Sequence, residues 1–176
     1  AVQVKRVPPD IEAGAGLGYM NFASLDGTRP AIYYVNLADT GNWPHYTLTS
    51  LTMHEAIPGH AWQGAYLAER QSEIHRISSL IGFNAFVEGW ALYAEQLADE
   101  VGMYKDDPLG QLGYFQAQRF RAARLVVDSG IHDKRWSREK AIEWMVDATG
   151  RSTGAITSEV DRYFVTPGQA CGYKVG

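Results

Sequence analysis

The sequence is poor in cysteine and in clustered basic residues, which argues against an internal disulfide and against nucleic acid as a partner. Cys171 is the only cysteine among 176 residues, so no internal disulfide can form and the redox compartment stays open. Lys and Arg number 16 against 20 Asp and Glu, a formal net charge of −4. The densest basic group, Arg119, Arg121 and Arg124, lies within a helical pattern. Nucleic acid is therefore excluded as the expected partner, because phosphate binding needs clustered basic residues.

Long apolar runs are also missing. No uncharged run reaches the roughly 18 residues that span a bilayer, so no membrane span is expected in this chain. The start, AVQVKRVPPD, has no apolar core of a signal peptide and no initiator methionine. We therefore expect a fragment or processed chain with something missing upstream. A composition of 45% hydrophobic and 20% charged residues is that of an ordinary globular protein, in one domain or one lobe.

The first 45 residues differ from the rest in being rich in glycine, proline, asparagine and aspartate. They contain one strand pattern, AIYYVN at 31–36, preceded by a turn around Asp26-Gly27. We predict a small β-hairpin or a short strand within an otherwise irregular segment, 1–45.

From Tyr46 onward the apolar residues recur at three- and four-residue steps, as on amphipathic helices. The clearest helices, with their expected end signals, are 83–101 before Gly102, 108–129 between Asp107 and Gly130, 138–149 between Ser137 and Gly150, and about 158–165 before Pro167. We predict a mainly α fold with about five packed helices, in which region 46–176 carries the functional site.

Residues 51–60, LTMHEAIPGH, contain two histidines beside a glutamate. In a helical His-Glu-x-x-His motif, two imidazoles one turn apart bind one zinc ion, and the glutamate takes a proton from the activated water. Here His60 follows His54 by six positions, which on a regular helix leaves the side chains about 120° apart. Pro58 and Gly59 predict a bulge or kink that absorbs the two extra residues. We therefore predict that His54 and His60 bind a metal, with Glu55 as general base.

Glu88 is the predicted third ligand. It stands beside the apolar stripe of helix 83–101, where a carboxylate is costly unless it is paired or binds a metal. Two histidines and one carboxylate leave a fourth position for water, which is typical of catalytic zinc. Each residue alone has an ordinary interpretation: a surface pair for His54 and Glu55, a hydrogen-bonded core position for His60, and an ion pair for Glu88. Their combination favours a Zn²⁺ site.

Four stretches carry a resemblance to a known family: HEAIPGH at 54–60, EGWALYAE at 88–95, RLVVDSGIH at 124–132 and PGQACGY at 167–173. With the LDGTRP segment from Leu25 and the YYVN strand, they resemble the C-terminal half of the bacterial family filed as domain of unknown function 885. That family is similar to helical zinc metallopeptidases of the gluzincin kind. The resemblance covers nearly the whole chain and departs from the standard zinc motif by the two-residue insertion.

The resemblance implies a mainly helical peptidase fold acting on a peptide substrate, with an N-terminal helical half preceding residue 1. It also implies an exported bacterial protein, periplasmic or lipid-anchored. Neither the residues nor the resemblance fixes the oligomeric state.

Helical metallopeptidases often use a histidine and a tyrosine to hold the oxyanion of the tetrahedral intermediate. The candidates are His132, expected in a loop after Gly130, and Tyr163 or Tyr173. The alternative for His132 is a C-cap interacting with the helix dipole, and for each tyrosine it is core packing. Three further aromatic residues are predicted to lie in the core: Trp43, Trp62 and Trp90.

Arg124 and Arg162 are candidates for binding a substrate carboxylate, because guanidinium suits bidentate pairing. The alternative for Arg124 is an ion pair with Asp128, four residues further along one helix face. Asp128 and Glu95 are candidates for orienting a ligand histidine; the alternatives are a structural role for Asp128 and a solvated position for Glu95.

The favoured function is zinc-dependent hydrolysis of peptide bonds, with Glu55 accepting a proton from the activated water. The alternative is a metal-binding but non-catalytic interaction module, since a fragment can lack the opposite wall of a cleft. A carboxylate-bridged di-iron protein is a third class, but such sites use Glu-x-x-His pairs, and the sequence contains none.

Overall fold

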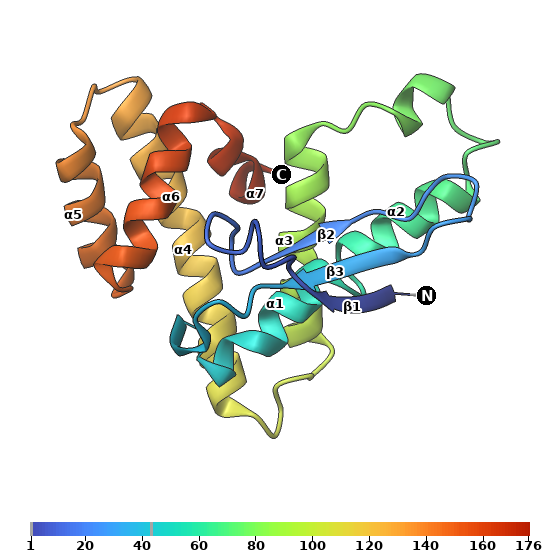
Figure 1. Ribbon diagram of the computed structural model, residues 1–176, viewed down its shortest axis with the longest axis horizontal. Coiled ribbons are helices and arrows are strands. Elements are labelled where there is room, and N and C mark those ends of the chain that lie inside the picture. The colour runs from blue at the N-terminus through green and yellow to red at the C-terminus, as the bar shows by residue number, and fades with distance from the viewer. Residues whose placement is uncertain (1, 43) are drawn as a thin grey trace.

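The computed structural model describes residues 2–42 and 44–176, and this part is mainly helical with a small sheet near the N-terminus (Figure 1). Six of its α-helices have eight residues or more: α1 Leu48–Glu55, α2 His60–Glu69, α3 Asn84–Glu100, α4 Pro108–His132, α5 Arg138–Thr149 and α6 Thr153–Val165. A single turn, α7 Gly172–Val175, ends the chain. The predicted mainly α architecture is confirmed.

The sheet has three strands, β1 Val2–Arg6, β2 Gly18–Asn21 and β3 Ala31–Val35, in the order β1-β3-β2. β3 pairs with β2 antiparallel, as the predicted hairpin requires, and with β1 parallel. Ala31, Ile32 and Tyr33 are all buried. Successive side chains of a strand point to opposite faces, so this part of β3 is covered on both faces of the sheet. Strand β1 was not predicted from the sequence. The sheet packs on α1 and α2, with β2 at its edge.

Helix α4 runs through the middle of the molecule and separates two groups of helices (Figure 1). On one side it packs against α5 and α6, and on the other against α1 and α3. The core on the α5–α6 side is built from apolar residues of all three helices and includes Phe120, Val127, Met145, Ile156 and Val160.

The predicted end signals of α5 are confirmed, as are the start of α4 at Asp107-Pro108 and the end of α6 at Val165, but the end of α4 and the start of α6 were misplaced. The Ser137 hydroxyl accepts from the Lys140 N–H, and Gly150 has a left-handed φ of 67°. Helix α4 instead continues through Gly130 to His132, so the predicted stop at Gly130 and the loop position of His132 were wrong. A Cβ at Gly130 would lie 2.6 Å from the Trp136 ring, so this glycine serves close packing.

Helix α6 begins at Thr153 rather than near residue 158, because the Ser152 hydroxyl caps it by accepting from the Ala155 N–H. Trp62 is 43% exposed and stacks on Trp90 at 5.3 Å, so the predicted core position of Trp62 was wrong. Trp43 lies outside the described residues.

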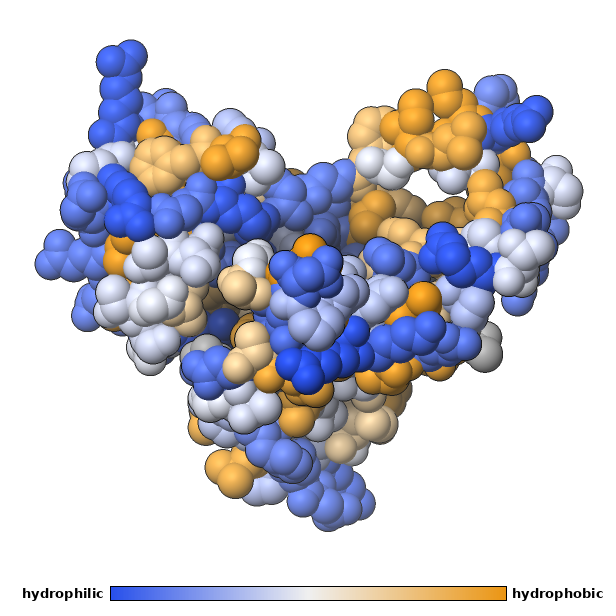
Figure 2. All heavy atoms as spheres, viewed as in Figure 1, coloured by the Kyte–Doolittle hydropathy of each residue, from blue (hydrophilic) through white to orange (hydrophobic). Residues whose placement is uncertain are grey.

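Apolar side chains are exposed on the arm that α2 and the following segment form beside a notch in the molecule (Figure 2). They include Ile77, Leu80, Ile81 and Phe83. Among the described helices, none combines the length and the hydropathy of a membrane span.

The helical motif region breaks between Ala56 and Gly59, where the two extra residues were predicted to be absorbed. Helix α1 ends at Glu55 and α2 begins at His60, so the two histidines lie on separate helices. Pro58 has no N–H to continue the helix. A Cβ at Gly59 would lie 1.8 Å from the His54 carbonyl oxygen, so only glycine lets the backbone fold back this closely.

We predict that Gly59→Ala destabilises the fold by at least about 2 kcal/mol, because the added methyl must displace the backbone of α1. Gly154→Ala is the matched control: its Cβ meets nothing within 4 Å, so the change should stay within about 1 kcal/mol. Urea unfolding followed by circular dichroism measures both. A Gly59→Ala protein as stable as wild type would contradict this packing.

Candidate metal centre

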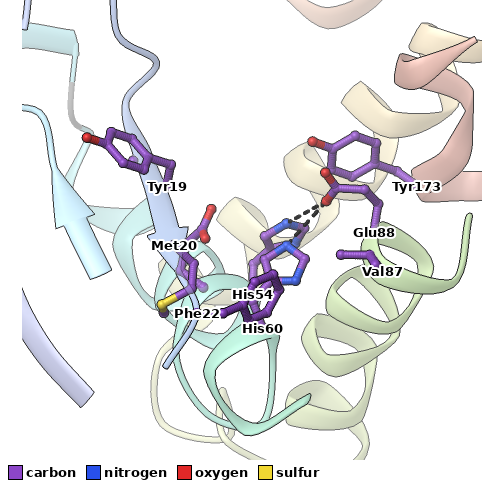
Figure 3. A pocket seen from close by; sticks show the side chains of 10 residues that line it. Tyr19, Met20, Phe22, His54, His60, Val87, Glu88 and Tyr173 are labelled. Carbon is purple, nitrogen blue, oxygen red and sulfur yellow. Dashed lines mark ion pairs between the residues drawn. The ribbon is translucent and has the colours of Figure 1, made fainter. Parts of the chain in front are cut away.

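Three predicted ligands converge from three helices. His54 lies in the last turn of α1, His60 begins α2, and Glu88 lies on α3. The imidazole centroids are 4.9 Å apart with the ring planes at 86°. Glu88 Oε2 lies 3.7 Å from His54 Nε2 and 3.3 Å from His60 Nε2, as the dashed lines in Figure 3 mark. The helix break therefore brings together two side chains that a regular helix would separate.

The three donor groups fit a divalent metal ion. One nitrogen from each histidine and one oxygen of Glu88 all lie within 4.8 Å of one another. Tetrahedral ligands at about 2.0–2.1 Å from zinc are separated by roughly 3.3 Å, close to the two measured distances. Glu88 Oε2 is buried and has no hydrogen-bond partner within the described residues. A buried carboxylate oxygen without a donor, facing two imidazole nitrogens, is suited to a cation.

The charge state of Glu88 is consistent with that role. Burial raises the pKa of the Glu88 carboxyl, but the imidazoles of His54 and His60 lower it by more than burial raises it. The resulting pKa of Glu88 is well below its usual range. Glu88 is therefore ionised at neutral pH.

Glu95 orients His54 from the side opposite Glu88. Its Oε1 lies 2.8 Å from His54 Nδ1, and its Oε2 accepts from the Ser50 hydroxyl at 2.7 Å. Arg121 lies 3.3 Å away and Glu95 is fully buried. Burial raises the pKa of Glu95, but Arg121 and His54 lower it below its usual value, which keeps the carboxylate charged. Accepting the Nδ1–H leaves His54 Nε2 free to face Glu88.

Two glutamines support the other ligands, and sequence patterns gave no signal for either. Gln63 Oε1 lies 3.5 Å from His60 Nδ1, and its amide donates to the Phe86 carbonyl at 3.2 Å. Gln169 Nε2 donates to Glu88 Oε1 at 3.3 Å. Recognising them requires knowing which helices pack together.

Glu55 lies beside the three ligands and faces the same cavity. It is 6% exposed, and its Oε2 has no hydrogen-bond partner in the described part of the chain. Burial raises the pKa of the Glu55 carboxyl, partly offset by the two imidazoles. A raised pKa makes this carboxylate a stronger base, and its unpaired oxygen is open to a water molecule.

The cavity has a volume of about 230 Å³. It is lined by Gly18, Tyr19, Met20, Phe22, His54, Glu55, His60, Val87, Glu88 and Tyr173. Tyr173 stacks on His54, with ring centroids 5.8 Å apart and planes at 16°. Figure 3 shows Tyr173 next to Glu88, and Tyr19 and Met20 on the opposite side of the histidines. Strand β2 thus forms one wall of the cavity and helices α3 and α7 form the other.

Two of the predicted oxyanion residues lie elsewhere. His132 is the last residue of α4, and its Nε2 lies 2.9 Å from the Tyr163 carbonyl oxygen. Tyr163 is fully buried; its hydroxyl donates to Glu159 at 2.8 Å and accepts from Arg124 at 3.0 Å. Neither residue lines the cavity, so of the three candidates the structure brings only Tyr173 to the ligands.

The predicted substrate-binding arginines both pair with Glu159, Arg124 at 2.9 Å and Arg162 at 3.1 Å. The predicted Arg124–Asp128 pair was therefore wrong. Asp128 instead accepts from the Gly168 N–H, at 3.2 Å to Oδ1 and 3.1 Å to Oδ2. This contact is structural, and Asp128 does not orient either candidate ligand histidine. Helical spacing put Arg124 and Asp128 on one face, but α6 supplies the nearer carboxylate.

The sequence matches the model of the family described as "Bacterial protein of unknown function (DUF885)" over residues 1–176. The match extends over the whole chain and does not single out the C-terminal half that was expected. A search of curated proteins gives no match.

The fold is similar to the crystal structure of the putative lipoprotein from Colwellia psychrerythraea, with a TM-score of 0.94 and 47% sequence identity. That alignment covers 99% of this chain but 30% of the other. The chain thus spans less than a third of the length of that protein.

We predict that Glu95→Gln weakens zinc binding about 10- to 100-fold, because the acceptor that orients His54 loses its charge. Glu100→Gln, on an exposed end of the same helix, is the control and should bind zinc as wild type does. Competition with a chromogenic chelator gives both affinities, after circular dichroism has shown that the variants are folded. Equal affinities for the two variants would contradict the orienting role.

Proposed function

The chain belongs to the bacterial family of unknown function DUF885, and we propose that it carries the zinc site of a metallopeptidase. The proposal includes a kinship with gluzincin-type helical peptidases. The observation that carries it is the convergence of His54, His60 and Glu88 in a cavity that also contains the unpaired carboxylate of Glu55.

His54, His60 and Glu88 would hold the zinc ion. When bound, zinc supplies a Lewis acid for the scissile carbonyl and lowers the pKa of water at its open coordination position. Glu55 takes a proton from the attacking water and passes it to the leaving amine. Its buried, unpartnered oxygen and raised pKa support this role. Tyr173, stacked on His54, is the residue we assign to donate a hydrogen bond to the developing oxyanion.

The cavity wall formed by strand β2 favours a peptide as the substrate. Strand β2 is an edge strand, and three of its residues, Gly18, Tyr19 and Met20, line the cavity. The free edge of a strand binds an extended peptide through backbone hydrogen bonds. Such binding would lay the scissile bond across the cavity, next to Glu55.

The coverage of 30% of the Colwellia psychrerythraea protein favours a second candidate, a metal-binding module whose activity depends on further chain. The N-terminal helical half expected from the sequence would supply that further chain. That protein's description as a putative lipoprotein also supports an exported, lipid-anchored location for this chain.

We expect Glu55→Gln to keep zinc at wild-type stoichiometry and to lower kcat by at least about 100-fold, because the amide cannot accept the proton. Glu69→Gln, on the exposed end of α2, is the control and should leave kcat unchanged. Cleavage of a mixed peptide library, read by mass spectrometry, measures turnover in each. An active Glu55→Gln protein would exclude the mechanism. Zinc-loaded wild type that cleaves nothing would favour the binding module.

A further inference from the structure

Four arginines gather where α4, α6 and α7 meet, behind the metal ligands. Two of them, Arg121 and Arg124, come from α4, Arg151 precedes α6, and Arg162 lies on α6. The carboxylates that pair with them number two: Glu95 with Arg121 at 3.3 Å, and Glu159 with Arg124 at 2.9 Å and Arg162 at 3.1 Å. Glu95 is also shared with His54. The cluster therefore has an excess of positive charge.

The excess of positive charge leaves individual guanidinium nitrogens without a hydrogen-bond acceptor. Arg121 Nε and Arg124 Nη1 are buried and have no hydrogen-bond partner within the described residues. Arg124 itself is 6% exposed. Arg151 forms no side-chain hydrogen bond or ion pair in the described chain and lies over the Phe120 ring at 4.2 Å. Burial and the neighbouring Arg121 and Arg124 lower the pKa of Arg151 to about 10. Arg121 and Arg124 thus each pair with one carboxylate but keep a nitrogen without an acceptor, and Arg151 pairs with none in this part of the chain. Buried polar nitrogens without an acceptor are costly, and a bound anion would supply acceptors for them.

One tyrosine ring separates this cluster from the metal centre. The Arg124 guanidinium carbon lies 4.4 Å from the centroid of the Tyr173 ring, and that of Arg121 lies 5.8 Å away. The same ring stacks on His54 and lines the cavity. Arg121 and Arg151 are partly exposed to solvent, whereas Arg124 is buried.

We propose that Arg121, Arg124 and Arg151 form a subsite for the free C-terminal carboxylate of a peptide bound at the metal centre. The proposal rests on the proposed peptidase function and makes the enzyme one that cleaves near the C-terminus. Guanidinium groups pair with carboxylates through parallel hydrogen bonds, and two of the three have nitrogens without partners. The Tyr173 ring lies between the arginines and His54. Because an extended residue spans about 3.3–3.6 Å, the carboxylate would lie on the order of two residues beyond the scissile bond.

The test compares N-acetyl-L-phenylalanine with its C-terminal amide, each titrated into the chain and followed by ligand-observed NMR, with and without added zinc. On the metal-free chain we expect the acid to bind at least about tenfold more tightly than the amide. Arg151→Gln should reduce that preference to less than about threefold. Arg138→Gln is the matched control, because Arg138 forms an exposed ion pair with Asp161 outside the cluster; it should keep the full preference.

Equal binding of acid and amide by the wild-type chain would overturn the proposal, as would a folded Arg151→Gln protein that keeps the preference. An acid preference that appears only after zinc is added would also overturn it, by assigning the carboxylate to the metal, while leaving the proposed zinc site intact. Conversely, an acid preference in a chain that binds no zinc would support the arginine subsite and contradict the peptidase function.

Discussion

The close approach of Gly59 to the carbonyl of His54 is the contact on which the candidate site depends. It closes the tight turn between α1 and α2, and this turn brings His60 to the cavity that His54 also lines. Had α1 continued as a regular helix, the six-residue spacing would have turned one imidazole away from the other. Proline ends the hydrogen-bond pattern of the helix, and glycine lets the backbone of the turn lie against the end of α1. The two inserted residues are thus what allows convergence from two helices.

The candidate site also depends on the buried carboxylate of Glu95. It contacts His54 and Ser50 on α1 and Arg121 on α4, so one side chain links the metal centre to the central helix. A fully buried charge is stable only where its partners are all in place. The same arginine borders the Tyr173 ring, which stacks on His54 from the other direction. The positions of the ligand, the tyrosine and the arginine cluster are therefore set by one network.

Features coded by neighbouring residues could be predicted from the sequence, whereas features set by distant contacts could not. The cap at Ser137, the stop at Gly150 and the break at Pro58 each depend on local backbone chemistry, and the structure has them where predicted. The helix end predicted at Gly130 was wrong, because this glycine makes room for the Trp136 ring, a contact that helix periodicity does not show. The alternative that paired Arg124 with Asp128 rested on their spacing along α4, but α6 brings a closer carboxylate, Glu159.

The proximity of Glu88 to the histidines could be predicted because an acidic residue interrupts an apolar stripe. The role of Glu95, two turns later, was left open, since only the packing of α1 and α4 against α3 decides it. His132 and Tyr163 were placed at the site by analogy with other peptidases. The structure instead joins them to each other at the α4–α6 contact.

Metal content tests the central claim most directly. The purified chain, dialysed against a zinc buffer and then against metal-free buffer, is analysed by inductively coupled plasma mass spectrometry beside His60→Ala and Glu88→Ala. His75→Ala, in an exposed turn after α2, serves as the control. We expect one zinc per chain in wild type and control, and little or none in the two ligand variants. Folded wild-type protein without zinc, or ligand variants that keep it, would contradict the convergence of His54, His60 and Glu88 on a metal.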